Sequence, residues 1–324
     1  MTDSADDLPT ITILTPCLNP GPHIVTAVDS VRRQNYPKIE HIVLDAVSSD
    51  GSLAALKESD GLRIVSEPDN GSHDAMNKGL RLARGEIIGF LNADDFYADG
   101  VLAEVGRAFA ADPALDVVAV GTVVFEERPD GGRRLLVARD HRTGDSFWLS
   151  ELAFGASGFN GRFFRRRVFE RFGNFEVAFD FSADRDFLNR LAVSDTKRLT
   201  LPRFGYFYRA HARSRTLNAD KRNAEAFADE HRIQAMAFAR RARASERPLF
   251  LAWHAFSGAK QCYLATKRGR PDTALRVALK MTQDDPLWLF RLPLALRERR
   301  AVRSAEEAST ANYGSGRQLD GTTI

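Results

Sequence analysis

Residues 87–97 read IIGFLNADDFY, a short apolar run that ends in the adjacent carboxylates Asp94 and Asp95. A run of mostly β-branched or bulky apolar residues is typical of a buried strand in a parallel sheet. Ligands bind such sheets at the carboxyl ends of the strands. Because two like charges repel each other there, we expect a divalent cation, Mg²⁺ or Mn²⁺, which would also bind phosphate oxygens. The alternative is a simple polar turn, since Asn and Asp are common turn formers.

Strand and helix patterns alternate around this run, from residue 10 to residue 112. Apolar runs predict strands at 11–15, 41–45 and 63–67. Apolar residues at helical spacing predict helices near 22–31, 53–56, 74–83 and 100–111. This β-α-β-α order with short loops predicts an α/β fold, a three-layer αβα sandwich with a mainly parallel sheet.

The pattern changes after Pro113. Residues 116–126 and 133–138 flank the turn PDGG and predict a β-hairpin. We further expect helices at 165–173 and from Ser182, a strand at 197–208, and mostly helices after that. The expected organisation is a flexible N-terminus at 1–9, one α/β domain at 10–215 with halves at 10–112 and 113–215, a helical C-terminal extension at 216–300, and a disordered tail at 301–324.

Composition narrows the class of protein. The 324 residues include 46 basic and 43 acidic ones, and a net charge of +3 argues against nucleic acid as a partner. Cys17 and Cys262 are far apart and lack metal-type spacing, so we expect a reducing, cytoplasmic compartment. The N-terminal MTDSADDLPT is acidic and polar, unlike a signal peptide. No apolar run approaches the roughly 18 residues of a membrane-spanning helix.

Charged residues also stand at the ends of other predicted elements. Asp45 ends a strand and could accept hydrogen bonds from a base or a ribose, with a turn cap as the alternative. Asp74 begins a helix, where a carboxylate often caps the backbone. Lys78 follows one turn later, within reach of a phosphate or of an i,i+4 ion pair with Asp74. Asp184 stands at the entry to another predicted helix.

Several stretches resemble the family-2 inverting glycosyltransferases, which have the GT-A fold. They are ITILTPCLN, LDAVSSDGS, SEPDNGSHDAMNKGLRLARGEIIGFLNADDFY, FFRRRVFERFGNFE and SADRDFLNRL, within about residues 10–215. The resemblance implies transfer of a sugar, with inversion, from a nucleotide-diphosphate donor such as a UDP-sugar to a hydroxyl of a glycan or lipid-linked acceptor. It also implies Mn²⁺ or Mg²⁺ as cofactor and a place in polysaccharide or cell-envelope biosynthesis.

The resemblance also assigns roles to residues of both halves, the first binding the nucleotide and the second carrying the acceptor side and the catalytic base. The donor nucleotide would be bound by Thr15, Pro16, Asn19, Asp45, Asp74, Lys78, Asn92 and Asp94, with Asp45 at the base. The metal would be held by Asp94, Asp95 and His211, and the acceptor side would be formed by Asn160, Gly161 and Arg162. Asp184 would be the catalytic base, with Asp186 as its rival.

The chain departs from the family pattern at three places. Asn92 stands in place of the first carboxylate of the Asp-x-Asp triplet. Ala46 and Val47 stand in place of two glycines of the base-binding loop, which affects the shape of that loop. Ala183 stands in place of an acidic residue beside the base. His211 lies where many of these enzymes carry a metal-binding histidine, and a structural or solvated histidine is the alternative.

Residues 286–303, PLWLFRLPLALRERRAVR, combine Leu, Trp and Phe with arginines. This composition suits a helix in the interface of an anionic membrane, which would place the protein at the inner membrane face. The alternative is an ordinary helix docked on the catalytic domain, and Pro293 would kink either one.

Two further enzyme classes are disfavoured. A sugar-phosphate nucleotidyltransferase needs a Gly-rich phosphate loop after the first strand, and a nicotinamide dehydrogenase needs GxGxxG there. The stretch TPCLNPGP offers neither. A non-catalytic sugar-nucleotide-binding or membrane-scaffold protein stays open as an alternative of a different kind.

Overall fold

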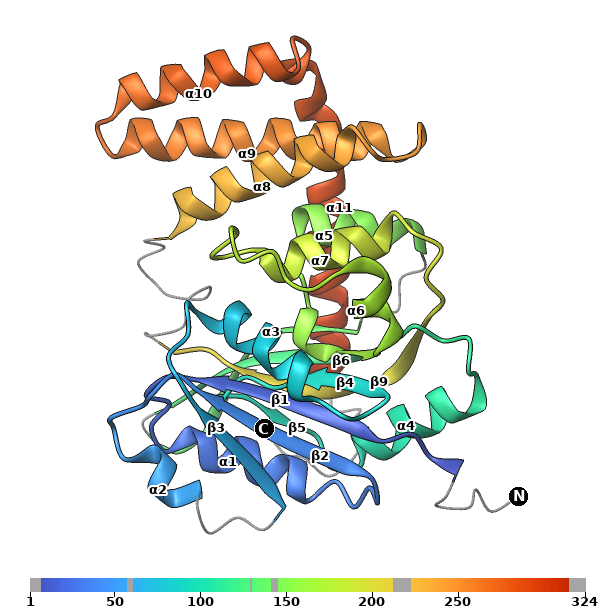
Figure 1. Ribbon diagram of the computed structural model, residues 1–324. Helices are drawn as coiled ribbons and strands as arrows, with labels where there is room; N and C mark the ends of the chain where they lie inside the picture. Colours follow the sequence, from blue (N-terminus) through green and yellow to red (C-terminus); the bar gives the residue numbers. More distant parts are fainter. Residues whose placement is uncertain (1–6, 57–60, 129, 141–144, 212–222, 315–324) are drawn as a thin grey trace.

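The computed structural model describes residues 7–56, 61–128, 130–140, 145–211 and 223–314 (Figure 1). Nine strands within these ranges form one sheet, in the order β3-β2-β1-β4-β8-β6-β9-β5, with β7 paired to β6. The strands are β1 (Ile11–Cys17), β2 (Ile39–Asp45), β3 (Leu62–Ser66), β4 (Ile87–Phe90), β5 (Phe96–Tyr97), β6 (Val117–Glu127), β7 (Arg133–Arg139), β8 (Arg162–Arg165) and β9 (Arg198–Arg209).

The first half of the sheet is parallel. β3, β2, β1 and β4 lie side by side in the same direction, as the apolar runs predict. β1 and β4 are buried along their whole length, because helices cover both faces of the sheet. The register places Asp45 between Cys17 and Ser66, where the three strands end. The loop after β4 leaves the sheet at this same edge.

The second half of the sheet is mixed. β8 is antiparallel to β4 and pairs Gly89 with Phe163, so that Arg162 at the start of β8 lies near the carboxyl end of β4. β6 is antiparallel to β8 and parallel to β9. The two-residue strand β5, which the sequence did not predict, is antiparallel to β9. These pairings bring the end of β9 to the loop between β4 and β5.

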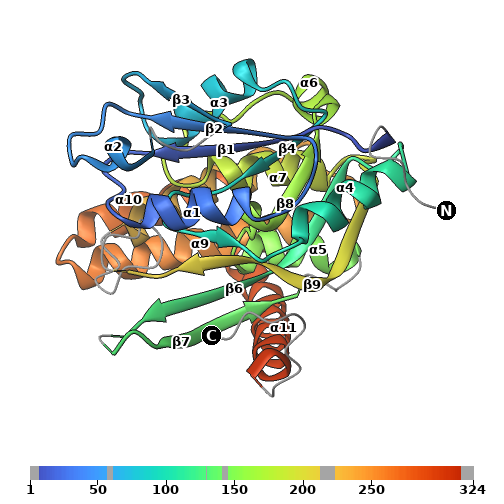
Figure 2. The ribbon, with the colours of Figure 1, turned by 90° about the horizontal axis from the view of Figure 1, so that it is seen from below.

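Helices cover both faces of the sheet (Figures 1 and 2). One face carries α1 (His23–Arg32), α2 (Ser52–Leu56) and α4 (Val101–Ala111), and the other carries α3 (Ser72–Leu82), α6 (Arg167–Phe172) and α7 (Ala183–Ala192). Phenylalanines fill the core under α7, where the rings of Phe169 and Phe187 stack with centroids 4.9 Å apart. The expected three-layer α/β sandwich is confirmed.

The helical extension lies beyond α7 (Figure 1). It consists of α8 (Ala224–Ala239), α9 (Arg247–Lys267), α10 (Pro271–Asp284) and α11 (Trp288–Gly314). α11 runs back from this bundle past α5 (Asp145–Phe154) to β7. A salt bridge of 2.6 Å between Arg139 and Glu306 fastens α11 to the end of β7.

The structure contradicts the disordered tail expected at 301–324, because α11 continues to Gly314. α11 buries Ala295, Val302 and Ser309, which recur every seven residues on one face. Small residues on that face leave little hydrophobic signal in the sequence, which is why the segment resembled a polar tail. The residues after Gly314 lie outside the described ranges.

One expected domain boundary, and part of an expected terminal segment, lie outside the residues that the structure describes. Most of the expected flexible N-terminus at 1–9 and the junction at 215–216 lie outside the described ranges. β9 ends at Arg209 and α8 begins at Ala224 on either side of that junction. The position of the boundary therefore stays a prediction.

Candidate active site

The loop after β4 places two neighbouring carboxylates in different environments. Asp94 has 31% of its side chain exposed, whereas Asp95 is fully buried. Oδ1 of Asp95 accepts a hydrogen bond of 2.8 Å from the backbone N–H of Arg209. Its Oδ2 accepts hydrogen bonds from the Asn92 side-chain amide and the Tyr206 hydroxyl. A cation shared by Asp94 and Asp95 does not fit this geometry, because both oxygens of Asp95 are engaged inside the protein.

Asp95 instead connects the loop to β9. Burial and the charge of Asp94 raise the pKa of Asp95 well above its usual range, against the hydrogen bonds that favour its ionised form. Burial also raises the pKa of Tyr206, so its hydroxyl remains a donor. On the same strand, Nε of Arg209 donates to the backbone carbonyl of Asp94 at 2.9 Å. These contacts fix the backbone from which the Asp94 side chain projects.

His211 lies two residues after the end of β9, on the exposed side of this loop. Its Nε2 is 2.7 Å from Oδ2 of Asp94, and 29% of its side chain is exposed. Its ring stacks on that of His23 at the start of α1, with centroids 6.4 Å apart. The loop after β4, the segment after β9 and the start of α1 therefore come together around His211.

The donor set at Asp94 fits a cation that is shared with a substrate. Among the described residues, no group of three or more His, Cys, Asp or Glu side chains could hold a metal ion by itself. Asp94 and His211 supply one carboxylate and one imidazole. Mg²⁺ in nucleotide sites is bound through one or two carboxylates together with substrate phosphates, and Mn²⁺ takes similar oxygen ligands. A diphosphate would supply the remaining oxygens.

Asp45 is held inside the protein by its neighbours. Its side chain is 1% exposed, and both oxygens accept hydrogen bonds from the Ser48 backbone N–H, at 3.2 and 3.1 Å. Oδ2 also accepts a hydrogen bond of 2.6 Å from the Ser66 hydroxyl. Burial acts to raise the pKa of Asp45, but these hydrogen bonds outweigh it and leave the pKa lowered. Contact with a base would require one of these bonds to be exchanged, so that role stays a prediction.

The loop after β2 is fastened to the loop after β1. The Asn19 backbone N–H donates to the Ser48 hydroxyl, and Oδ1 of Asn19 accepts from the Ser49 backbone N–H, both at 2.8 Å. Val47, which stands in place of a family glycine, has a φ of 61°. This left-handed conformation is unfavourable for a β-branched residue. Strained backbone of this kind concentrates at functional loops, and Asn19 remains exposed beside it.

Thr15 and Pro16, expected at the donor site, belong to the buried end of β1. Both are buried, and the Thr15 hydroxyl lies 2.9 Å from Nε2 of His41 on the neighbouring strand. Burial lowers the pKa of His41 to about 3, which keeps this imidazole neutral near pH 7. The two residues thus form part of the buried sheet.

Asp74 and Lys78 hold the loop that precedes α3. Oδ2 of Asp74 accepts a hydrogen bond of 3.0 Å from the Asn70 backbone N–H. Nζ of Lys78 donates to the Pro68 carbonyl at 2.5 Å and lies 3.6 Å from Oδ2 of Asp74. These are the capping and ion-pair contacts that the sequence left open as alternatives, and a role toward the donor stays a prediction.

Asp184 is the second residue of α7 and is partly exposed. Its Oδ2 accepts a hydrogen bond of 2.6 Å from the Ser157 hydroxyl. The rival Asp186 forms an ion pair of 3.0 Å with Arg190 one turn later, and burial raises its pKa. Of the two carboxylates, Asp184 is the one that the structure pairs with a hydroxyl group rather than with a cation.

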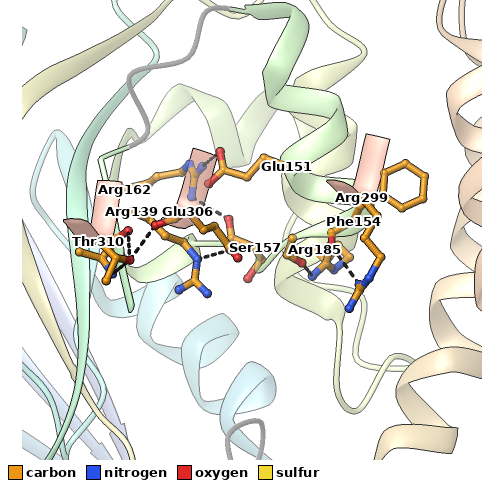
Figure 3. A network of polar contacts seen from close by, with 11 residues as sticks. Arg139, Glu151, Phe154, Ser157, Arg162, Arg185, Arg299, Glu306 and Thr310 are labelled. Carbon is orange, nitrogen blue, oxygen red and sulfur yellow. Dashed lines mark hydrogen bonds and ion pairs between the residues drawn. The ribbon is translucent and has the colours of Figure 1, made fainter. Parts of the chain in front are cut away.

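Two buried arginines hold the loop that carries Ser157 (Figure 3). Nη1 of Arg162 donates to the carbonyl of Ser157 at 2.7 Å and to that of Gly158. Nη2 of Arg185 donates to the carbonyl of Gly155 at 2.9 Å. Burial lowers the pKa of both guanidinium groups to about 10, so each is still cationic at neutral pH. The two arginines therefore fix the hydroxyl that contacts Asp184.

The structure contradicts part of the acceptor side expected at residues 160–162. Arg162 is 0% exposed, so it cannot contact an acceptor directly. Gly161 is also buried, and a Cβ there would lie 2.8 Å from the Thr122 hydroxyl. Asn160 is partly exposed, and its role on the acceptor side stays a prediction.

Sequence reasoning did not single out Ser157, Tyr206 or Arg209. Ser157 lies in the stretch GASG, which signals only a turn. Tyr206 and Arg209 bind a carboxylate 111 and 114 positions earlier in the chain. No spacing rule connects residues so far apart.

Comparisons with known proteins agree with this architecture. The family model described as Glycosyl transferase family 2 matches residues 12–173. An uncharacterised glycosyltransferase of Mycobacterium tuberculosis is 31% identical over 192 residues, which cover 57% of this chain and 70% of that protein. The PGL/p-HBAD biosynthesis glycosyltransferase of Mycobacterium bovis is 30% identical over 186 residues, which cover 55% and 68%.

Solved structures share the fold at low sequence identity. The mannosyltransferase PcManGT from Pyrobaculum calidifontis, in complex with GDP-Man and Mn²⁺, has a TM-score of 0.55 at 21% identity, covering 96% of this chain and 88% of that one. TarS 1–349 of S. aureus with UDP-GlcNAc has a TM-score of 0.55 at 15% identity, covering 97% and 94%. This chain spans 55% of a longer TarS structure. The expected GT-A fold is confirmed, and the family model together with the relatives shows that the chain belongs to glycosyltransferase family 2.

Proposed function

We propose that the protein transfers a sugar, with inversion, from a nucleotide-diphosphate donor to an acceptor hydroxyl, and that transfer depends on a divalent cation. The observation that carries this proposal is the pairing of Asp94 with His211 at the sheet edge where the donor of a GT-A enzyme binds. Solved neighbours hold UDP-GlcNAc, or GDP-Man with Mn²⁺. These bound donors support a nucleotide sugar as donor, and we take a UDP-sugar as the first candidate.

Asp94 and His211 would hold the cation, Mn²⁺ or Mg²⁺. When bound, the cation supplies positive charge that stabilises the departing nucleoside diphosphate. Asp95 would not contact it. Its part is to keep the Asp94 backbone in place through β9.

Asp184 would accept the proton of the acceptor hydroxyl as that oxygen attacks the anomeric carbon. Ser157 holds one oxygen of the Asp184 carboxylate and thereby sets the direction of the other. Attack from the face opposite the leaving group, in a single displacement, inverts the anomeric centre. No covalent intermediate is needed.

The acceptor is proposed from the chemistry of the relatives. One relative is a PGL/p-HBAD biosynthesis glycosyltransferase. We therefore propose a glycan or lipid-linked acceptor in polysaccharide or cell-envelope biosynthesis.

A lipid-linked acceptor would bring the protein to a membrane surface. Within the described ranges, no helix has the length and apolar character needed to cross a bilayer. α10 and the segment at the start of α11, here called the apolar tip, expose large apolar side chains. Phe290 is 80% exposed, and Leu275, Leu279, Leu287 and Leu289 are exposed as well. Exposed Arg276 and Lys280 on α10 lie among them in sequence. We propose that this apolar tip, together with its basic residues, contacts the anionic inner face of the membrane.

The remainder of α11 is docked rather than free. Glu306 pairs with Arg139, and the Ser150 hydroxyl donates to Glu298 at 2.9 Å. We therefore propose that the membrane contact first expected at 286–303 involves only the start of that segment, together with α10.

A thermal-shift panel tests the donor and the cation together. The full chain would be heated with UDP-GlcNAc, UDP-glucose, GDP-mannose or a dTDP-sugar, each with Mn²⁺ or with EDTA. A ligand that binds the folded state raises the melting temperature with occupancy. We expect at least one nucleotide sugar to stabilise the chain only when Mn²⁺ is present. Equal stabilisation in EDTA would contradict the dependence of donor binding on the cation. No stabilisation by any donor would contradict the proposed activity.

A further inference from the structure

The helical extension binds the start of α7, the helix that carries Asp184 (Figure 1). Both oxygens of Glu230 on α8 accept hydrogen bonds from the Phe181 backbone N–H, at 3.2 and 3.1 Å. One of them also accepts a hydrogen bond of 2.6 Å from the Ser182 hydroxyl. Nε2 of Gln234, one turn further along α8, donates to the Ser182 carbonyl at 3.0 Å and to its hydroxyl at 2.9 Å. Two side chains of α8 thus hold the two residues before α7.

These hydrogen bonds are buried, so the loss of one partner would leave the other polar group with neither a protein partner nor water. Ser182 is 1% exposed and Gln234 is 0% exposed. Ser182 is the N-cap residue of α7, but its side chain does not cap the helix and bonds to α8 instead. Removing one partner of a buried hydrogen bond costs about 1–3 kcal/mol, because the other partner stays desolvated. The start of α7 is therefore fixed by the extension rather than by its own cap.

Arg185 provides a second connection on the other side of Asp184. Its Nη2 donates to the Gly155 carbonyl at 2.9 Å, in the loop that carries Ser157. Its guanidinium also lies 6.0 Å from the ring centroid of Trp253, a residue of α9 that is 1% exposed. The two residues before α7, and the residue after Asp184, all contact the extension.

We propose that Glu230 and Gln234 are positioning residues for the catalytic base. The helical extension would then set the position of the Asp184 carboxylate and so affect the rate of transfer. The inference rests on the proposed role of Asp184 as the base. Asp184 is two residues from Ser182, so a shift of the helix start would move its carboxylate relative to the acceptor. A misplacement of about 1 Å at a reacting group can lower a rate by about 10²-fold. Donor binding at Asp94 would be unaffected, because it involves other elements.

The test uses Glu230→Ala in the full chain. The rate is the Mn²⁺-dependent release of nucleoside diphosphate from UDP-GlcNAc or GDP-mannose, whichever stabilises the chain more, with water as acceptor. We expect kcat to fall by about 10-fold to 100-fold while the donor KM changes less than about twofold. Glu230→Gln keeps an acceptor oxygen and should recover most of the rate. Gln234→Met, which replaces the amide by an apolar group of similar size and so removes the donor to Ser182, should lower kcat several-fold and replaces Glu230→Ala if that variant does not fold.

Glu225→Ala is the matched control on the same helix. The Glu225 carboxylate pairs with Arg268 and Arg270 inside the extension, away from α7. This variant should lose some thermal stability and keep its kcat. If Glu230→Ala and Gln234→Met behave like Glu225→Ala, the contacts are merely structural and the inference is wrong.

A second background separates this inference from the proposed function. Asp184→Asn should itself lose most of the rate, and Glu230→Ala should then cause no further loss, because the base that it positions is already absent. A further loss of the same size as in the parent would show that Glu230 acts on something else. Full activity of Asp184→Asn would overturn the assignment of the base, and this inference with it.

Discussion

His211 Nε2 lies 2.7 Å from Asp94 Oδ2, although the two residues are 117 positions apart in the chain. The contact joins the loop after β4 to the end of β9 on the exposed side. Asp95 joins the same two elements on the buried side, through the Arg209 backbone N–H. Asp95 is thus held inside the protein by its hydrogen bonds, whereas Asp94 is partly exposed with an imidazole beside it.

The metal site is tested with Asp94→Asn and His211→Gln. Asp94→Asn should abolish Mn²⁺-dependent binding of UDP or GDP, because the carboxylate that holds the cation is gone. His211→Gln should weaken it by at least about 10-fold, because even the loss of a residue that only orients a metal ligand costs about 10-fold to 100-fold. Calorimetry with Mn²⁺ and with EDTA measures both. Unchanged affinity in Asp94→Asn would show that the cation, if used, binds elsewhere.

Asp45 is tested by separating stability from recognition. Asp45→Ala removes the acceptor of the Ser48 and Ser66 hydrogen bonds, so we expect a loss of about 1–3 kcal/mol in the free energy of unfolding. If Asp45 also reads the base, the donor KM should rise and the preference between UDP and GDP should weaken, while kcat stays near normal. A fall in kcat alone would place Asp45 in the chemistry and contradict the recognition of the base.

His41 should make the fold less stable in acid. Burial lowers its pKa from 6.5 to about 3, so between these values the unfolded chain binds a proton that the folded chain does not. Its contribution is complete above pH 6.5 and is lost as the pH falls toward 3. At about 1.4 kcal/mol per pKa unit, the loss at pH 5 is roughly 2 kcal/mol. Urea unfolding measures the free energy of unfolding at pH 7.5 and at pH 5. The difference between the two values should be roughly 2 kcal/mol smaller in His41→Gln than in the parent. The same difference in both proteins would contradict this role of His41.

The apolar tip of the extension is tested with vesicles. Leu289→Ser and Phe290→Ser together should reduce co-sedimentation with anionic phosphatidylglycerol vesicles, because the side chains that would enter the interface are removed. Val177→Ser, which changes an exposed apolar residue at 54% exposure elsewhere, is the control. Donor affinity should be the same in the double variant, in Val177→Ser and in the parent. Equal sedimentation of both variants and the parent would favour an extension that only docks on the catalytic domain.

The sequence predicted the parallel half of the sheet well, since its strands are continuous apolar runs buried on both faces. It did not predict β5, which has only two residues and depends on β9 for its pairing. It also missed the second half of α11, where the buried face is made of Ala295, Val302 and Ser309. Short or weakly apolar elements owe their structure to partners far away in the chain, which periodicity cannot show.

The candidate site followed the same rule. The sequence singled out Asp94 and Asp95 as a pair of metal ligands. It could not show that Asp95 is buried, because its hydrogen-bond partners Tyr206 and Arg209 lie on a strand far away in the sequence. The family resemblance predicted that Arg162 contacts the acceptor. It is buried instead, because β8 pairs with β4 on one side and with β6 on the other. Residue types could be predicted from local motifs, whereas their exposure depended on the assembled sheet.

The most direct test of the account compares Asp184→Asn with Asp186→Asn. Donor affinity with Mn²⁺ is measured by calorimetry, and the rate of nucleoside diphosphate release is measured with the same donor. Asp184→Asn should bind the nucleotide sugar as the parent does and lose about 10²–10⁴ in rate, as expected for a missing general base. Asp186→Asn, whose carboxylate pairs with Arg190, should lose stability and keep most of its rate per folded molecule. Full activity in Asp184→Asn together with loss in Asp186→Asn would contradict the account.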